Sequence, residues 1–269
     1  MNKNFKIFHH FTLKGALDIQ EKEVISLVGA GGKTTLMFAL AGELTKTGKI
    51  IITTTTTKIF TPTSSQSPFY FLSSDENIIE KTLLSKISNY QHITIASEKI
   101  AESGKLKGIP PSMITRLSKI DSVSHIIIEA DGAAKKPLKA PASYEPVIPE
   151  STTLVVAVVG LDTLGCPLDE KNVFRPEIVC KLTDQKIGSH ITEETIATVI
   201  THPSGILKGS PLKARIMVFL NKTDRIKDHE NVRRLAENIL KKRAYPIERV
   251  VLGQAKNIKT KKEVVSLLE

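Results

Sequence analysis

The sequence predicts an α/β fold in which helices cover both faces of a mostly parallel sheet, giving three layers. Apolar, β-branched runs alternate with stretches of helical composition, as repeated strand–helix–strand units require. Several of these runs, such as 126–128, 154–159 and 216–220, are continuously apolar, which is typical of strands buried on both faces. A third observation is the run 24–28, which leads directly into a glycine-rich turn and a helix.

The predicted elements follow one another with short connections. Strands are expected at 24–28, 49–54, 69–72, 93–96, 125–129, 154–159, 215–220 and 249–252. Helices are expected between them at 34–46, 75–88, 111–119, 193–200 and 229–242. Because no long linker, repeat or low-complexity region interrupts this alternation, we expect residues 1–269 to form a single domain.

The bulk composition suits a globular protein with a substantial core. Hydrophobic residues make up 41% of the 269 residues and charged residues 25%. The sequence contains neither a run of about 18 apolar residues nor a signal-peptide core, so we expect a cytoplasmic protein with no membrane association. The two cysteines, Cys166 and Cys180, fit no metal-ligand spacing and are expected to be reduced and structural.

The formal net charge of +10 raises the question of nucleic acid. The excess is local, because residues 208–262 hold 16 Lys and Arg against 5 Asp and Glu. Most of these charges lie on the predicted C-terminal helix and the tail, where a solvated face accounts for them. Aromatic residues are only 5%, with no tryptophan, so little stacking surface exists for single strands. Nucleic-acid binding is therefore not expected, although the basic region could face an acidic partner.

Residues 28–35 read VGAGGKTT and are typical of a phosphate-binding loop, or P-loop. A glycine-rich turn lets backbone N–H groups converge on one anion, and the following helix directs its positive end to the same point. Lys33 would reach the outer phosphates of a nucleoside triphosphate, while the Thr34 hydroxyl would bind Mg²⁺. Leu27 occupies the position of the first Walker A glycine, so the loop is a short variant. The predicted phosphate-binding residues are Gly29, Ala30, Gly31, Gly32, Lys33, Thr34 and Thr35. A tight turn that uses glycine only for packing is the alternative.

The run 125–132, HIIIEADG, has the Walker B arrangement of a buried strand that ends in carboxylates. Glu129 and Asp131 should point to the same side, where one would hold Mg²⁺ and the other would orient the attacking water. The N–H of Gly132 would face the γ-phosphate. With Lys33, these two carboxylates form the predicted catalytic group, and Thr34, Asp131 and Glu129 the predicted metal site. Alternatively, one carboxylate only caps the following turn.

A third motif follows the predicted strand 215–220, where NKTD matches the NKxD sequence that reads guanine in GTPases. Asp224 would accept hydrogen bonds from guanine N1–H and N2–H₂, which adenine lacks. Lys222 would lie over the base, and Asn221 would tie the loop together. The loop that contains Ala255 and Lys256 resembles the one that contacts guanine O6, except that Gln254 replaces Ser or Thr. A polar strand end is the alternative for NKTD. The threonine run 53–57 could place a hydroxyl near the metal or serve only as a β-branched strand.

The segment 128–149, IEADGAAKKPLKAPASYEPVIP, resembles the YqeC family, together with VGAGGKTTL, IITTTTTKIF, HPSGILKG and VFLNKTD. The resemblance runs from about residue 13 to 269. It implies a P-loop NTPase-like protein that acts in the maturation of selenium-dependent molybdenum hydroxylases, with a client enzyme or other maturation factors as partners. It also implies that a further set of charged residues lies near the site. These are Glu129, Asp131, Lys136, Lys139, Glu145 and Arg175.

Taken together, the motifs predict a protein that binds Mg·GTP and hydrolyses it slowly as a switch. The combination of E-x-x-G and NKxD also looks like that of metallochaperone GTPases, which is an analogy at the level of the fold. One alternative is an ATP-dependent ligase or kinase-like enzyme, because the short loop also looks like the GTNGKTT loop of amino-acid ligases. Another alternative is a scaffold that binds nucleotide without turnover.

Overall fold

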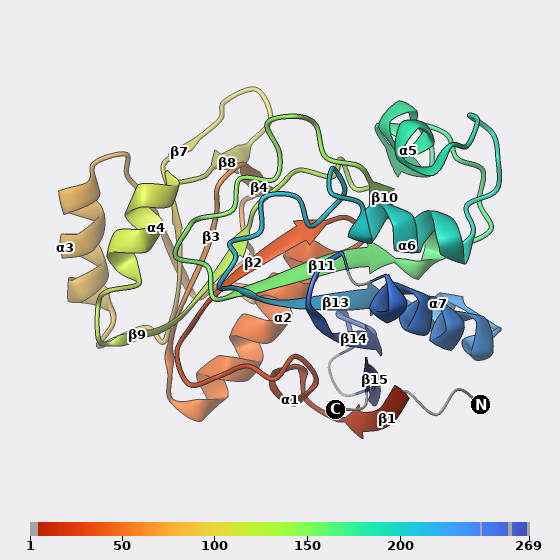
Figure 1. Cartoon of the computed structure of the whole chain (residues 1–269). Helices are drawn as coiled ribbons and strands as arrows, with labels where there is room; N and C mark the ends of the chain where they lie inside the picture. Colours follow the sequence, from red (N-terminus) through yellow and green to blue (C-terminus); the bar gives the residue numbers. More distant parts are fainter. Residues whose placement is uncertain (1–4, 243, 258–259, 268–269) are drawn as a thin grey trace.

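The computed structural model describes residues 5–242, 244–257 and 260–267, and a ten-stranded sheet runs through it (Figure 1). Eight neighbouring strands are parallel, and two antiparallel strands extend one edge. In spatial order the strands are β1 (Phe5–His10), β15 (Lys262–Leu267), β14 (Ile247–Gly253), β13 (Arg215–Asn221), β11 (Leu154–Gly160), β2 (Glu23–Gly29), β9 (Val123–Glu129), β3 (Ile50–Thr55), β6 (His92–Ala96) and β5 (Phe69–Leu72).

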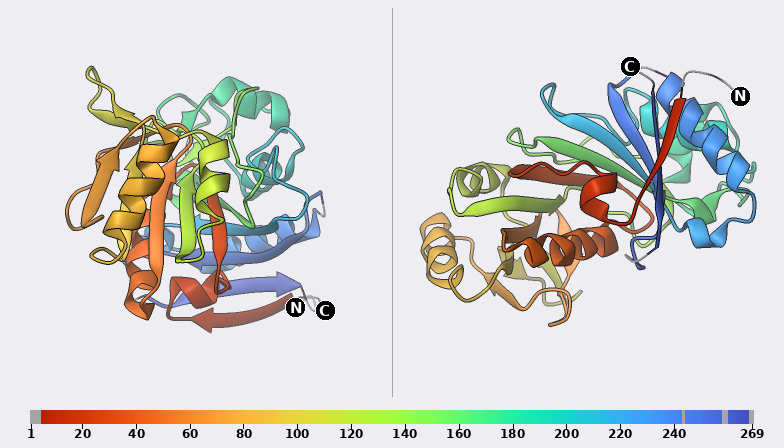
Figure 2. Two further views of the ribbon diagram at one scale, coloured as in Figure 1. Left: turned by 90° about the vertical axis from the view of Figure 1, so that its left-hand side faces the viewer. Right: turned by 90° about the horizontal axis from the view of Figure 1, so that it is seen from below.

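Helices cover both faces of this sheet, and the core is accordingly divided into two layers. One layer lies between the sheet and two helices, α1 (Leu13–Ala16) and α2 (Lys33–Leu44). The other layer contains residues of α3 (Glu76–Lys86), α4 (Pro111–Leu117), α5 (Pro176–Thr183), α6 (Glu193–Thr201) and α7 (His229–Lys241). Figure 2 shows the sheet between these two sets of helices. The predicted three-layer α/β fold is therefore confirmed.

The alternation of side chains in the central strands explains the two layers. In β11, Val155, Ala157 and Val159 belong to one core layer, whereas Leu154, Val156 and Val158 belong to the other. All seven residues of this strand are buried, as its uninterrupted apolar sequence predicts. The sheet is thus anchored by strands that expose no face to solvent.

All the predicted strands and helices are present, with ends displaced by a few residues. The sequence reasoning missed the antiparallel strands β1 and β15, the short helix α1, and helix α5. It also missed two small sheets. One is antiparallel and consists of β4 (Lys58–Phe60), β8 (Lys105–Lys107) and β7 (Glu98–Lys99). The other pairs β10 (Leu138–Lys139) with β12 (Val173–Phe174) in parallel.

These small sheets lie beyond the carboxyl ends of the central strands. β4 follows β3 directly, and Gly108 N, just after β8, donates a hydrogen bond to the Thr57 carbonyl. Figure 1 shows β4, β8 and β10 on the same side of the main sheet. Residues of these small sheets line the cavity that is described in the next subsection.

Two further sequence-based expectations concern the membrane and the cysteines. No helix within the described ranges is both long and apolar enough to span a bilayer. Cys166 and Cys180 are free thiols and both are partly buried.

Candidate functional site

A cavity of about 1480 Å³ opens at the carboxyl ends of β2, β9 and β3. The turn after β2 and the first residues of α2 line it, together with the small β4–β8–β7 sheet and the loop after β9. Residues near β12 close another side. Ligands in parallel sheets bind at this edge, so the position agrees with the sequence-based expectation.

The glycine-rich turn is shaped by the strands beside it. Gly29, Gly31 and Gly32 all have positive φ angles, of 91°, 80° and 131°. A Cβ on Gly31 would collide with the backbone of Gly160, and one on Gly32 would collide with the Asn221 side chain. Glycine is therefore required here by backbone conformation and by close packing. The packing that the alternative explanation of the motif expected is therefore present, and it leaves the prediction of anion binding open.

The N–H groups of the turn divide into two sets. Gly29 N donates to Asp131 Oδ2 at 3.0 Å, Ala30 N to the Val158 carbonyl, and Gly31 N to the Lys136 carbonyl. The first helical hydrogen bond of α2 runs from Leu36 N to the Gly32 carbonyl. The N–H groups of residues 32–35 precede this bond and have no partner within the helix. They are the donors that α2 presents to an anion at its N-terminus.

Lys33 lies at the floor of the cavity and is 3% exposed. Its Nζ donates to the Gly29 carbonyl at 2.5 Å and lies 3.1 Å from Asp131 Oδ1 and 3.9 Å from Glu129 Oε1. Thr34 Oγ1 donates to Glu129 Oε2 at 2.6 Å. The sequence reasoning expected both carboxylates on the same side as Lys33, and this juxtaposition is present. It arises because β2 and β9 are neighbours, with Leu27 paired to Glu129.

These groups suit a Mg²⁺ ion held together with phosphate. Asp131 Oδ1 is buried and makes no hydrogen bond among the described residues, although Lys33 lies beside it. Burial raises the pKa of Glu129, against the opposing effects of Lys33 and of the Thr34 hydrogen bond. No cluster of three or more His, Cys, Asp or Glu side chains in the described ranges could hold a metal. One or two carboxylates with a hydroxyl, completed by phosphate and water, match the coordination that Mg²⁺ prefers.

A second buried lysine, Lys139, also pairs with Asp131. Lys139 is fully buried, and its Nζ lies 2.9 Å from Asp131 Oδ2 and 2.8 Å from Glu145 Oε2. It also donates to the Gly132 carbonyl at 2.6 Å. Arg175 pairs with the same Glu145 oxygen. Burial opposes ionisation of Glu145, but hydrogen bonds from Arg175 and Lys139 outweigh it and hold its pKa below the ordinary value.

The family resemblance anticipated this network, whereas the motifs did not. Of the charged residues that it implied, Lys139, Glu145 and Arg175 are joined to Asp131 in one chain of ion pairs. Lys136 lines the cavity, but its Nζ donates to the Lys171 carbonyl and it takes no part in the chain.

The predicted base-reading residues lie at the ends of β13 and β14, which are adjacent strands. Asn221 joins the loops physically: its Nδ2 donates to the Gly31 carbonyl at 2.8 Å, and its Oδ1 accepts from Ala255 N at 2.9 Å. The side chain of Asp224 is 49% exposed and lies 3.6 Å from Arg225. The linking role expected of Asn221 is thus present, and Asp224 is accessible to a ligand.

The remaining predicted residues occupy less defined positions. Lys222 has a φ of 66°, and its Nζ lies 2.6 Å from Asp162 Oδ2. Its side chain also lines the cavity. Lys256 is exposed. Gly132 and Thr35 line the cavity.

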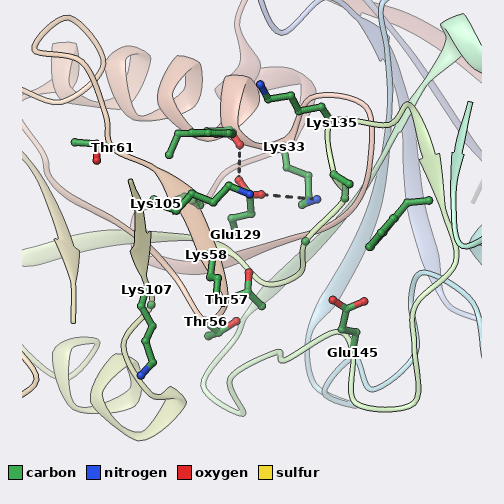
Figure 3. A pocket seen from close by; sticks show the side chains of 18 of the residues that line it. Lys33, Thr56, Thr57, Lys58, Thr61, Lys105, Lys107, Glu129, Lys135 and Glu145 are labelled. Carbon is green, nitrogen blue, oxygen red and sulfur yellow. Dashed lines mark hydrogen bonds and ion pairs between the residues drawn. The ribbon is translucent and has the colours of Figure 1, made fainter. Parts of the chain in front are cut away.

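The threonine run divides into buried and cavity-lining residues. Thr53 hydrogen-bonds His92 and Thr94, Thr54 bonds the Ile95 carbonyl, and Thr55 bonds the Glu129 carbonyl. These buried hydroxyls form hydrogen bonds from β3 to the neighbouring strands β6 and β9. For Thr53, Thr54 and Thr55 this supports the alternative that the run serves only as a strand. Thr56 and Thr57 line the cavity (Figure 3).

The fold and the site geometry together define an α/β protein of the P-loop NTPase-like class. The YqeC protein family model matches residues 25–177. The chain is also 35% identical over 230 residues to the uncharacterized protein YqeC of Escherichia coli strain K12, a match that covers 86% of each chain. This chain belongs to the YqeC family.

Solved structures give a more distant likeness. A crystal structure of FtsY from Mycoplasma mycoides aligns with 94% of this chain at 12% identity and a TM-score of 0.41. The alignment covers 66% of the FtsY chain. A second crystal form of that protein gives a TM-score of 0.36, again at 12% identity and over 94% of this chain, and covers 67% of the FtsY chain.

Proposed function

We propose that this chain binds Mg·nucleoside triphosphate, prefers guanine, and hydrolyses the nucleotide slowly as a switch. The observation that carries the proposal is the convergence of Lys33, Thr34, Glu129 and Asp131 within hydrogen-bonding or ion-pairing distance at the N-terminus of α2. A lysine, a hydroxyl and two carboxylates at a helix N-terminus form the set that phosphate and Mg²⁺ require together.

Each group of the site would have a separate role. The N–H groups of residues 32–35 bind the phosphates, and Lys33 exchanges its contact with Asp131 for one with the outer phosphates. Thr34, with either Glu129 or Asp131, would hold Mg²⁺, which would supply positive charge against the phosphates as negative charge develops. The carboxylate that does not bind the metal orients the attacking water. Lys139 keeps its ion pair with Asp131.

The guanine preference rests on Asn221 and Asp224. Because Asn221 connects Gly31 of the phosphate loop to Ala255 of the neighbouring loop, phosphate binding and base binding share one framework. The exposed Asp224 carboxylate can then accept hydrogen bonds from guanine N1–H and N2–H₂.

The biological role proposed for this switch is in the maturation of selenium-dependent molybdenum hydroxylases. Membership of the YqeC family supports this proposal, since the resemblance to that family carries the same expectation. The cytoplasm is the proposed location. The client enzyme, or another maturation factor, would be the partner that responds to the nucleotide state.

Nucleotide binding tests the site directly. We expect Mg·GTP to bind at least tenfold more tightly than Mg·ATP in calorimetric titrations, and Lys33→Ala to weaken GTP binding about 100-fold. Lys46→Ala removes a lysine from the exposed far end of the same helical segment and should change nothing. Circular dichroism of Lys33→Ala verifies folding, and Thr34→Val, which removes only the hydroxyl, should weaken Mg²⁺-dependent binding alone. Wild-type protein that binds no triphosphate would contradict the proposal.

The base preference has its own test. Asp224→Asn should shift preference from GTP toward xanthosine triphosphate, because the amide can donate to the xanthine carbonyl that replaces the guanine amino group. The thermal midpoint should stay within about 1 °C, since this side chain is half exposed and bonded only weakly to Arg225. Unchanged GTP affinity in this variant would refute the role of Asp224.

A second candidate function is an ATP-dependent ligase or kinase-like enzyme, which the size of the cavity favours. The space continues well beyond the phosphate loop, along β4 and β8, as an enzyme with a second substrate needs. Preference for ATP in the titrations would select this candidate. Tight GTP binding without phosphate release would instead select a scaffold that does not hydrolyse nucleotide.

A further inference from the structure

The cavity lies mainly to one side of the phosphate loop. In the main sheet, β11, β13 and β14 lie on one side of β2, and β9, β3 and β6 lie on the other. The proposed base-reading residues follow β13 and β14. The cavity is lined instead by residues 56–61, 105–111 and 132–136, which follow or face β3 and β9. A nucleotide whose base lies over β13 and β14 therefore leaves this side open beyond its γ-phosphate.

The volume of the cavity also exceeds what one nucleotide requires. Pockets for single small molecules enclose about 300–1,000 Å³. The cavity measures about 1480 Å³, and most of its lining residues lie away from the base-reading loops. The excess space is therefore on the γ-phosphate side.

That side carries cations without compensating anions. Lys58, Lys105 and Lys135 line the cavity, and within the described ranges none of them forms an ion pair or a hydrogen bond with a carboxylate. Among the other cations of the lining, Lys107 pairs with Glu98 and Arg175 pairs with Glu145, whereas Lys136 donates only to the Lys171 carbonyl. The unpaired ammonium groups therefore come from β4, from β8 and from the loop after β9.

Two of these ammonium groups contact the same aromatic ring, that of Phe60. Lys105 Nζ lies 4.9 Å from the centroid of the Phe60 ring, and Lys135 Nζ lies 4.7 Å from the same centroid. Phe60 is 48% exposed where it lines the cavity. The two lysines come from different elements, β8 and the loop after β9, so their shared contact with Phe60 is a tertiary arrangement.

The pair of lysines lies close to the proposed reaction centre. Figure 3 shows Lys105 ending beside Glu129, whereas Lys135 ends farther from that carboxylate and Lys107 points away from it. The charge of Lys105 also acts on Glu129, where it favours the ionised carboxylate. An anion held by Lys105 and Lys135 would therefore lie beside the position of the γ-phosphate.

We propose that Lys105 and Lys135, positioned by Phe60 and assisted by Lys58, bind a second ligand, a small organic phosphate, next to the nucleotide. This proposal rests on the proposed function, because it takes the phosphate loop as the nucleotide site. A phosphate group carries up to two charges and accepts several hydrogen bonds, which matches two unpaired ammonium groups from opposite walls. A single carboxylate would leave part of this charge uncompensated.

Pyrophosphate is a suitable probe, since it presents the phosphate chemistry without any other recognition element. Protein saturated with Mg²⁺ and a non-hydrolysable GTP analogue is titrated calorimetrically with pyrophosphate, at fixed free Mg²⁺. We expect one further equivalent to bind, and the double variant Lys105→Gln/Lys135→Gln to weaken it at least tenfold. The analogue itself should bind this variant within twofold of wild type. Lys46→Gln, which removes an exposed charge elsewhere, should bind pyrophosphate as wild type does.

The outcomes separate this proposal from the preceding one. In Lys33→Ala, where the phosphate loop is impaired, pyrophosphate should still bind to the second subsite. Analogue binding without additional pyrophosphate binding overturns the second subsite and leaves the nucleotide proposal standing. Pyrophosphate affinity that falls equally in Lys46→Gln, or a site that binds a single-stranded oligonucleotide more tightly as its length increases, also overturns it. Phe60→Leu tests the positioning role and should weaken pyrophosphate severalfold, with all lysines retained.

Discussion

At the scale of single residues, Asn221 links two loops through the hydrogen bonds of one side chain. Its amide fills both hydrogen-bonding roles at once, as donor to Gly31 O and acceptor from Ala255 N, and the residue is buried. The collision that a Cβ on Gly32 would have with this same amide shows how closely the two loops approach. One side chain therefore fixes the separation between the phosphate loop and the loop after β14.

Replacing Asn221 with alanine should both destabilise the protein and weaken nucleotide binding. The change leaves a buried carbonyl and a buried N–H without partners, which costs about 1–3 kcal/mol for each group. We expect a loss of at least 2 kcal/mol in urea denaturation and a matching loss of GTP affinity. Asn89→Ala, at an exposed position, is the control and should change neither quantity. Wild-type stability in the Asn221 variant would show that the two bonds carry no weight.

Lys139 is a fully buried lysine that forms ion pairs with Asp131 and Glu145. Removing one partner from a buried ion-pair network leaves the others uncompensated, which typically costs about 3–5 kcal/mol. Lys139→Met retains most of the volume and should lose stability in that range, because Asp131 and Glu145 remain. Lys107→Met breaks only the surface pair with Glu98 and should cost less than about 1 kcal/mol. Equal losses in the two variants, measured by chemical denaturation, would contradict this account.

The sequence predicted the proximity of Lys33, Glu129 and Asp131, but not the contacts of Lys139 and Phe60. Lys33, Glu129 and Asp131 were placed together correctly, because each follows a recognisable strand and parallel strands bring their ends to one edge. The contact of Lys139 with Asp131 was not accessible to motif reasoning. It depends on the path of residues 132–145, a loop with little periodicity, and only family resemblance indicated those residues. Phe60 and its two lysines gave no signal, since a cation–π contact between distant elements has no local pattern.

At the scale of elements, the parallel strands and the longer helices were predictable, whereas the antiparallel pair β1–β15 and the two small sheets were not. The strands β1 and β15 pair with each other at the margin of the sheet and keep partly exposed, mixed sequences. Neither the continuous apolar run of a buried strand nor a helical period identifies such segments. Helix α5 was missed for a related reason: it has only eight residues and follows Arg175, which adopts a left-handed conformation.

Helix α6 illustrates how a terminus can determine local stability. Thr192 accepts a hydrogen bond from Thr195 N, and the Thr195 hydroxyl accepts one from Thr192 N, so the two residues form a capping box. Thr192→Ala should lower the free energy of unfolding by about 1 kcal/mol. Thr198→Ala lies within the same helix and loses only a bond to the exposed Glu194, so it should have a smaller effect. Thermal denaturation of both variants makes the comparison, and an equal loss would show that the cap contributes nothing specific.

At the scale of the whole molecule, burial of a histidine makes stability depend on pH. His92 on β6 is 4% exposed and hydrogen-bonds Thr53, and burial lowers its pKa from 6.5 to about 4. The unfolded chain accepts a proton near pH 6.5, whereas the folded protein resists it until about pH 4. Protons therefore bind the unfolded state preferentially in this window, and stability falls as the pH falls.

The size of this effect can be measured. Between pH 7 and pH 5, His92 should contribute a loss of about 2 kcal/mol. Urea denaturation at both pH values checks this, with His92→Gln as the comparison, because glutamine does not titrate. The loss in the variant should be smaller by about that amount. His125 is also buried with a lowered pKa and remains in both proteins, so the difference isolates His92. An identical pH dependence would contradict the assignment.

The pairing of β1 with β15 has a practical consequence for finding partners. Phe5 stands opposite Leu267, so the two ends of the described chain emerge side by side. Figure 1 shows this corner at the lower right of the molecule, away from β4 and β8, which line the cavity. A surface tether or a fused reporter attached at either end would project away from the cavity mouth. The protein can therefore be immobilised by an end for binding experiments with the cavity left open.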